Sequence, residues 1–288
     1  MATLLTLRRK IKAAQNISKT TRAMQMIAAS KLKGAQDAAL SSRPYVEKLT
    51  AITQEVTFKT SDEKKHPYMI LNTDTTKTLL IVLSPDKGSC GPLVTNLLKE
   101  FLSYAQNEKD SSFIVVGKKA ENKVIKLENE VLATFHFGTT RPTFDMVFPI
   151  IKLIDEYYLS GKVQSVKVLF TDFKSFFHQA PTITQLLPIS LPDAEDVKIN
   201  NTDSLYEPSL EEMIPSLLKQ YLEMSLFQLY LESFLSEQAA RMIAMQNATN
   251  NAKDIIEDLK LEYNKTRQAK ITSELLDITG GRTQVEAE

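Results

Sequence analysis

A glycine-rich turn is the part of the sequence with the clearest potential for chemistry. Residues 84–91 read Ser-Pro-Asp-Lys-Gly-Ser-Cys-Gly, and they follow a predicted strand and open a predicted helix. Because backbone N–H groups at a helix N-terminus can bind phosphate, a nucleotide or phosphate site is one interpretation. The G-x-x-x-x-G-K-[ST] motif of phosphate-binding loops is absent. A turn that only reverses the chain is therefore the favoured interpretation.

The other reactive residue types do not form a catalytic or metal-binding pattern. Cys90 is the single cysteine, which excludes an intrachain disulfide. It precedes a predicted helix and could be a nucleophile, but no histidine lies near it in the sequence. Carboxylate pairs such as Glu211–Glu212 and Glu257–Asp258 are typical of a solvated helix surface. We therefore expect no catalytic residue, no cofactor and no metal.

The charges are balanced overall but unevenly distributed. Lys+Arg and Asp+Glu both number 35 in 288 residues, and no apolar run is long enough to span a membrane, so we expect a soluble protein. The first 36 residues contain no acid. A solvated helix face is one interpretation, and a surface that meets an acidic protein or a phosphate backbone is the favoured one. The basic residues of this segment are Arg8, Arg9, Lys10, Lys12, Lys19, Arg22, Lys31 and Lys33.

The N-terminal segment, residues 1–58, is predicted to be a long coiled-coil helix. Apolar or small residues recur there at spacings of three and four, which is typical of a coiled-coil stripe. Pro44 should kink this helix or end its first stretch. The stripe consists of Leu4, Leu7, Ile11, Ala14, Ile17, Thr21, Met24, Ala28, Leu32, Ala35, Ala39, Ser42, Val46, Leu49, Ile52 and Val56.

The C-terminal segment, residues 208–280, repeats this pattern. A first heptad frame includes Leu217, Phe227 and Phe234, and the frame then slips by one residue to Leu235, Ala239 and the residues that follow. Pro208 and Pro215 mark the predicted start of the helix, and Gly280–Gly281 predicts its end. Residues 281–288 are expected to be a flexible tail.

Between the two helices, residues 75–192 are predicted to form a Rossmann-like α/β domain. Strands are predicted at 78–83, 113–116, 131–137, 166–173 and 182–189, and helices at 93–106, 118–127 and 143–159. Strands that alternate with helices imply a largely parallel sheet. The predicted fold class is thus an α/β domain plus a long antiparallel coiled coil formed by the N- and C-terminal helices.

The expected pairing leaves one helix end without a partner in the chain. If residue 56 lies near residue 210, Leu4 falls opposite roughly residue 261, and about 20 residues extend further at about 1.5 Å per residue. A lone helix is marginal in water, so we expect another molecule to receive this extension.

Three segments resemble ATP synthase gamma subunits. The N-terminal segment contains Thr-Thr-Arg-Ala-Met-Gln-Met-Ile-Ala-Ala-Ser-Lys at 20–31. The C-terminal segment contains Ser-Glu-Gln-Ala-Ala-Arg-Met-Ile-Ala-Met at 236–245 and Tyr-Asn-Lys-Thr-Arg-Gln-Ala-Lys-Ile-Thr-Ser-Glu-Leu at 263–275. The middle resembles the family more loosely, through residues 86–91 and 205–208.

This resemblance implies a non-catalytic rotor shaft with no active site of its own. In the family the paired helices enter a ring of α and β subunits, and the α/β domain lies near the epsilon subunit and the membrane c-ring. One copy would couple proton-driven rotation to ATP synthesis, with no nucleic acid bound and no transmembrane segment. Carried over to this sequence, the β-subunit contacts would be Met24, Arg241, Arg267, Gln268 and Thr272, and the c-ring foot contacts Tyr206 and Glu207.

The sequence also departs from the family pattern. It lacks the paired cysteines of the chloroplast members, and Ser204 stands where many relatives have an aromatic residue. The missing cysteine insertion predicts a bacterial protein bound peripherally to the cytoplasmic face of the plasma membrane, with a processed organellar protein as the alternative. Two rival interpretations remain: an α/β enzyme with coiled-coil arms, and a basic coiled-coil module that binds nucleic acid.

Overall fold

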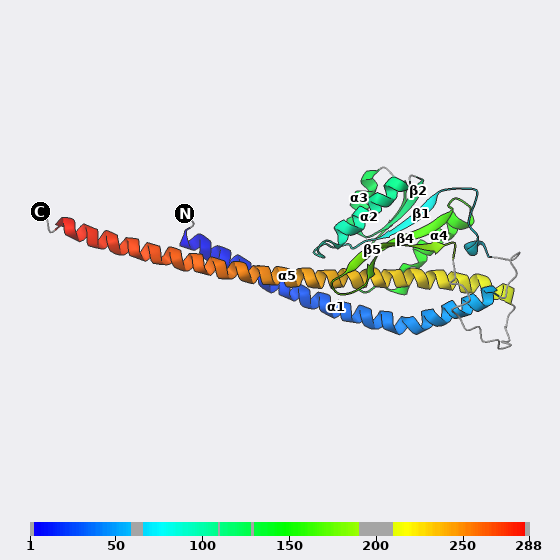
Figure 1. Ribbon diagram of the computed structural model, residues 1–288, viewed down its shortest axis with the longest axis horizontal. Coiled ribbons are helices and arrows are strands. Elements are labelled where there is room, and N and C mark those ends of the chain that lie inside the picture. The colour runs from blue at the N-terminus through cyan, green and yellow to red at the C-terminus, as the bar shows by residue number, and fades with distance from the viewer. Residues whose placement is uncertain (1–2, 59–65, 109, 128–129, 190–209, 286–288) are drawn as a thin grey trace. The chain divides into compact units, whose positions relative to one another are not determined.

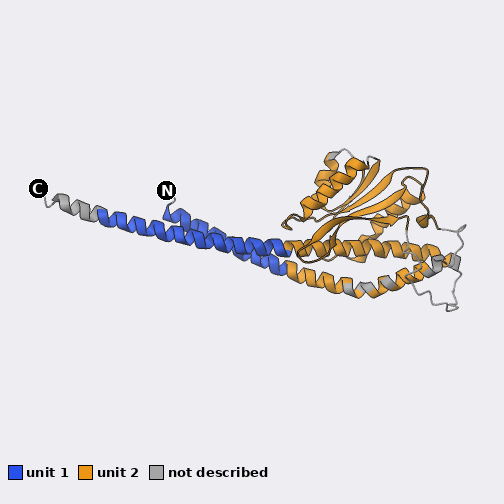
Figure 2. Ribbon diagram, viewed as in Figure 1, with its two compact units in different colours: residues 1–27, 242–288 blue, residues 28–241 orange. Residues whose placement is uncertain are grey.

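The computed structural model describes residues 3–58, 66–108, 110–127, 130–189 and 210–285. They divide into two compact units, which are coloured separately in Figure 2. Unit 1 comprises residues 1–27 and 242–288, and unit 2 comprises residues 28–241. No helix within the described ranges is long and apolar enough to cross a membrane.

Two long helices come before and after the α/β domain in the sequence. Helix α1 spans Leu4–Phe58 and helix α5 spans Leu210–Val285 (Figure 1). Pro44 and Pro215 both lie inside helices, so Pro44 does not end α1 and Pro215 does not mark the start of α5. The predicted stop at Gly280–Gly281 is also wrong, because α5 continues to Val285. Each glycine costs a helix only about 1 kcal/mol relative to alanine, which does not force an end.

Unit 1 is an antiparallel pair made by the first part of α1 and the last part of α5. The hydroxyls of Thr21 and Thr249 share a hydrogen bond of 2.7 Å across the pair. The predicted register pairs Thr21 with about residue 244, so the observed partner lies about five residues further along α5. The buried residues of this pair are Leu7, Ala14, Met245, Thr249 and Ala252.

Among the stripe residues whose side chains the structure describes, which leaves out Ser42 and Val56, the contact face of α1 differs from the prediction at three places. Ile17, Met24 and Ile52 are 56%, 45% and 44% exposed. The next residue in each case, Ser18, Gln25 or Thr53, is the more buried one. Small polar side chains can face a close helix partner when they are hydrogen-bonded, as Thr53 is to the Leu49 carbonyl oxygen at 2.7 Å.

Unit 2 contains a five-stranded sheet in the order β3-β2-β1-β4-β5. Strands β1 to β4 run parallel, and β5 pairs antiparallel with β4, which confirms the predicted largely parallel sheet. The strands are β1 (Thr78–Leu83), β2 (Ser111–Val116), β3 (Glu130–Phe135), β4 (Ser165–Phe173) and β5 (Gln179–Leu187).

Helices cover the sheet as the crossover rule requires. Helices α2 (Leu93–Asn107) and α3 (Lys118–Val124) connect β1 to β2 and β2 to β3, and they pack on one core cluster with Leu80 and Phe113. Helix α4 (Phe148–Leu159) returns the chain to β4 in the opposite direction, so a right-handed crossover puts it on the other face. Short 3-10 turns lie at Pro67–Met69, Ile125–Leu127 and Phe144–Met146.

Helix α5 is buried on nearly all sides from Leu229 to Ala240. Before that stretch, the most buried face carries Leu218, Leu222 and Leu226, whereas Leu217 and Phe227 of the predicted first frame are half-buried. The second predicted frame is confirmed at Leu235 and the buried residues that follow it. The two frames differ because α5 has neighbours on more than one side.

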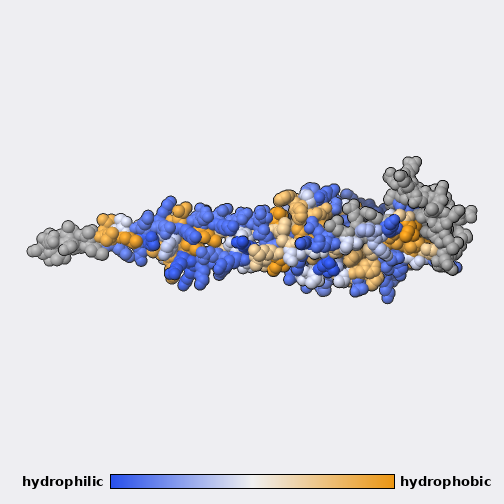
Figure 3. All heavy atoms as spheres, turned by 90° about the horizontal axis from the view of Figure 1, so that it is seen from below, coloured by the Kyte–Doolittle hydropathy of each residue, from blue (hydrophilic) through white to orange (hydrophobic). Residues whose placement is uncertain are grey.

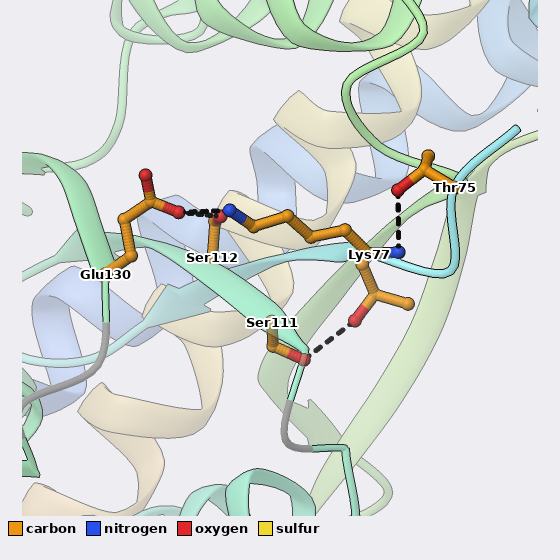
Figure 4. A network of polar contacts seen from close by, with 6 residues as sticks. Thr75, Lys77, Ser111, Ser112 and Glu130 are labelled. Atoms are coloured by element: carbon orange, nitrogen blue, oxygen red, sulfur yellow. Dashed lines mark hydrogen bonds and ion pairs between the residues drawn. The ribbon is translucent and has the colours of Figure 1, made fainter.

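Polar side chains contact one another at the end of the sheet where β1 and β2 begin (Figure 4). The ammonium of Lys77 pairs with the Glu130 carboxylate, which also accepts a hydrogen bond of 2.7 Å from the Ser112 hydroxyl. The hydrogen bond from Lys77 holds the pKa of Glu130 below its usual value. These contacts join β3 to β2 and to the residue that precedes β1, and we assign them a structural role.

Candidate partner-binding surfaces

Residues 267–276 of α5 are exposed on every side of the helix. The Thr272 hydroxyl donates a 3.0 Å hydrogen bond to the Gln268 carbonyl oxygen, and Lys270 pairs with Glu274 at 3.6 Å. Residues four apart lie on one helix face, so the predicted contact residues Gln268 and Thr272 share a face, with Arg267 beside them.

This exposed part of α5 presents apolar and polar side chains together. Ile271 and Leu275 are 48% and 58% exposed, although they lie between charged residues. Figure 3 shows small hydrophobic patches among hydrophilic residues along unit 1. A surface of this kind is typical of a helix that meets another molecule.

The outer face of α1 in unit 1 is apolar and basic. Met24 is exposed as a contact residue must be, and Ile17 and Ile27 are 56% exposed on positions of nearly the same face. Seven basic residues of the acid-free segment are exposed, and six of these lie in unit 1. Lys31 and the exposed Lys33 lie in unit 2, and the Lys31 side chain is half-buried. The exposed residues give α1 a positive surface able to attract an acidic partner.

Arg241 is engaged inside its own unit. Its guanidinium forms an ion pair with Glu237 at 2.7 Å and donates to the carbonyl oxygens of Lys87 and Gly88, both at 3.2 Å. Only 16% of the side chain is exposed. The two remaining predicted contact residues, Tyr206 and Glu207, lie outside the described residues.

Polar groups of the glycine-rich turn are hydrogen-bonded to other parts of the chain. Asp86 accepts hydrogen bonds from the backbone N–H groups of Lys118 at 2.9 Å and Gly138 at 2.8 Å. The Ala120 N–H donates to the Ser84 hydroxyl at 3.0 Å. The N–H groups of Lys118 and Ala120 belong to the start of α3, whereas the turn opens α2. The turn itself contributes the Asp86 carboxylate and two carbonyl oxygens that bind Arg241. A carboxylate at this place disfavours a phosphate site, because like charges repel.

Reactive chemistry at this turn is disfavoured too. Cys90 is 1% exposed and packs with Leu93 and Ala240. Burial raises the pKa of its thiol, and the positive charge of Arg241 only partly opposes this shift. A buried thiol with a raised pKa is a poor nucleophile. Across the described parts of the chain, no group of three or more His, Cys, Asp and Glu residues could hold a metal ion.

A pocket of about 220 Å³ lies between β5 and α5. Its lining includes Thr184, Leu222 and Gln228, and its only titratable side chain is Tyr221. It contains no acid–base pair, so it does not favour the rival interpretation as an enzyme.

The burial of Glu237 and the contact of Lys31 with the Thr139 carbonyl oxygen are not predictable from the sequence. Glu237 is 3% exposed, and burial raises the pKa of its carboxyl group, with Arg241 opposing the shift. The spacing of four residues between Glu237 and Arg241 was the available signal, but such pairs are common on exposed helix surfaces. Burial of this pair could not be inferred from the spacing.

Comparisons with known proteins agree with this architecture. A family model described as ATP synthase matches residues 3–285. The ATP synthase gamma chain of Dehalococcoides mccartyi is 40% identical over 283 residues, which cover 98% of each chain. That of Burkholderia ambifaria is 36% identical over 293 residues, covering 99% of this chain and all of the relative.

Solved structures share the fold at lower identity. A chain of the Euglena gracilis mitochondrial ATP synthase matches with a TM-score of 0.67 and 18% identity, covering 99% of this chain and 95% of that one. A chain from the central stalk and c-ring of the Tetrahymena thermophila enzyme matches with a TM-score of 0.59 and 22% identity, covering 80% and 99%. Together with the sequence matches over almost the entire length, these findings establish that the chain belongs to the ATP synthase gamma chain family.

Proposed function

We propose that this chain is the rotor shaft of an F-type ATP synthase. Family membership over nearly the whole chain supports this role. A further matched chain belongs to a structure described as the rotor of the Euglena gracilis mitochondrial enzyme, with a TM-score of 0.65. The expected partners are the α and β subunits of the catalytic ring, the epsilon subunit and the membrane c-ring, with one copy per complex.

The observation that carries the proposal is the exposed stretch of α5 from Arg267 to Leu276, which lies beyond the start of α1. In the register set by Thr21 and Thr249, Leu4 lies opposite about residue 266, and α5 continues for about 20 residues to Val285. Helices of this length are marginal in water without tertiary contacts. A ring of subunits that encloses the helix would supply those contacts, and the exposed residues Arg267, Gln268 and Thr272 would meet the β subunits.

Contact at the other positions is proposed from the resemblance to the family. Met24 would face a β subunit from the basic outer surface of α1. Arg241 is assigned to the same contact by the resemblance, although most of its guanidinium is engaged inside unit 2. Tyr206 and Glu207 are proposed as foot residues that meet the c-ring.

The uneven surface of the shaft would couple its rotation to the catalytic sites. A shaft with unevenly placed charged and apolar residues cannot contact three equivalent β subunits alike. Each catalytic site then has its own conformational equilibrium, biased by its contact free energy with the shaft. Proton-driven rotation moves this bias from site to site, so that ATP is formed and released in turn.

The chain itself would be non-catalytic, and the supporting observations are the hydrogen-bonded glycine-rich turn and the inert Cys90. It would bind no cofactor, and it would lie peripherally at the cytoplasmic face of a bacterial plasma membrane.

The test is native mass spectrometry of this chain co-expressed with α and β subunits from the same genome. We expect one copy per ring and full ATPase activity only in the complex. A chain that stays apart from the ring would contradict the proposal. Nucleotide titration of the isolated chain would then be the next measurement, with Lys87→Ala as the variant.

A further inference from the structure

Two loops meet beside helix α5 at the end of the sheet where β1 and β2 finish. One is the turn 86–91 after β1, and the other is the segment 137–139 after β3. Asp86 joins them, because its Oδ2 accepts a hydrogen bond from the Gly138 N–H at 2.8 Å. Its Oδ1 accepts from the Lys118 N–H at 2.9 Å and from the Phe137 N–H at 3.4 Å. One carboxylate therefore ties three segments together.

The first loop is fastened to α5. Arg241 reaches two carbonyl oxygens of the turn while its other nitrogen binds Glu237. Cys90 and Leu93 pack against Ala240 at the same place. Hydrogen bonds to a guanidinium are stronger than those between neutral groups, and this one is largely shielded from water.

The second loop is fastened to both helices. The ammonium of Lys31, on α1, donates a hydrogen bond to the Thr139 carbonyl oxygen. Phe137 stacks on Tyr230 of α5, with ring centroids 5.4 Å apart and planes at 8°. We call the set Lys31, Asp86, Glu237 and Arg241 the loop clamp.

The charges of the loop clamp balance one another. It contains two basic and two acidic groups, and Lys31, Asp86 and Arg241 all interact electrostatically with the buried Glu237. The Oε2 atom of Glu237 is buried without a hydrogen-bond partner among the described residues. Removing one basic group would leave this carboxylate with less compensation, which is costly for a buried charge.

The loop clamp lies at the boundary of unit 2. Arg241 is the last residue of that unit, and Lys31 lies three residues after its first residue, Ala28. Each helix is therefore held to the α/β domain close to the point where the chain passes into the other unit. A helix held by one contact could turn about it, whereas two helices held to two joined loops resist twisting.

We propose that the loop clamp is the joint that transmits torque between the α/β domain and the helix pair. This inference rests on the proposed rotor function. It assigns Arg241 a positioning role inside the chain, through the loop carbonyl groups, in addition to any contact with a β subunit.

The single cysteine provides the first test. Cys90 lies in the clamped turn, so its labelling rate by a maleimide reports how often the turn opens. Arg241→Gln and Asp86→Asn should each accelerate labelling about tenfold, as expected when charge-assisted hydrogen bonds are lost. Lys219→Met is the matched control. Lys219 lies on the same helix as Arg241, but its partly exposed ion pair is with Asp155 of α4, away from the turn, so the labelling rate should not change. Unchanged labelling in both clamp variants, with wild-type circular dichroism, would overturn the proposal.

The second test measures coupling in the assembled complex. Lys31→Met and the double variant Lys31→Met/Arg241→Gln should lose part of the ATP-driven proton pumping per ATP hydrolysed, with the larger loss in the double variant. Lys31→Arg should restore pumping, and Lys219→Met should match wild type. Full pumping in the double variant, despite faster Cys90 labelling, would show a clamp that carries no torque. Failure of the wild-type chain to join the ring would instead contradict the proposed function.

Discussion

Glu232 lies half-buried on α5 and has a charged neighbour in Asp172 of β4. Burial raises the pKa of Glu232, the Asp172 charge raises it further, and a hydrogen bond from Gln228 partly opposes the shift. Because the folded-state pKa is raised, the ionised carboxylate destabilises the fold above that pKa. The cost disappears as the pH falls through the folded-state pKa.

Glu232→Gln should therefore stabilise the chain at pH 8 by about 1 kcal/mol, because the amide keeps the oxygen that accepts from Gln228 and carries no charge. The gain should shrink as the pH falls through the raised folded-state pKa toward the ordinary value of 4.5. Urea unfolding at pH 8 and at about pH 4.5 measures both effects, and Glu257→Gln on the exposed face is the control. A gain that grows toward acidic pH would contradict the assigned pKa direction.

At the residue scale, exposure of the predicted contact residues could be inferred from the sequence, but the contacts of buried polar residues could not. The sequence predicts Met24, Arg267, Gln268 and Thr272 as available for contact, and the structure leaves all four exposed. Whether they touch a partner stays a prediction. The engagement of Arg241 could not be foreseen, because it depends on a turn about 150 residues away in the chain.

At the scale of the element, the exposed end of α5 should be needed for assembly or coupling. Shortening the chain after Leu261 should weaken assembly with the ring or coupling to proton pumping. The loss should exceed that from any single substitution on the α/β domain surface, such as Lys152→Ala. Part of the segment removed lies beside α1, so a second truncation after Thr266 removes only the part of α5 that extends beyond the start of α1. Co-purification with the ring and ATP-driven proton pumping measure the two effects. Unchanged pumping after the second truncation would count against an enclosing ring.

The face of α5 that packs inside unit 2 can be tested by paired leucine substitutions. Leu218 is fully buried and Leu217 is half-buried. Leu218→Ala should lower the free energy of unfolding by about 3 kcal/mol, and Leu217→Ala by roughly 1 kcal/mol. Equal losses in denaturant unfolding would place the contact face between the two residues.

Some elements can be predicted from the sequence because they are buried on every face. The prediction for β1 matches the observed strand at both ends, since a central parallel strand buried on both faces is a continuous apolar run. The α1 stripe is less readable, because apolar Ile17 faces outward while Ser18 faces inward. Apolar residues kept outside for another molecule resemble core residues in a single sequence.

At the scale of the whole molecule, stability should differ strongly between the two units. Unit 2 contains the sheet core, with β1 fully buried, whereas residues 267–276 are exposed throughout. Amide hydrogen exchange in the free chain should be slowest in β1 and β2 and fastest in 267–276, by several orders of magnitude. Protection of 267–276 should appear only after assembly with the ring. Strong protection of that segment in the free chain would mean that it already has a partner.

The positive surface of α1 has a consequence for the speed of assembly. Exposed charges act over about 10 Å at 0.1 M salt, which is enough to guide an approaching acidic partner before any contact forms. Added salt should therefore slow capture of the chain by the ring, while the release rate, set by the packed helices, changes little. An acid-free helix would thus favour early encounter during biogenesis, when each newly made shaft must find a ring before proteases find it.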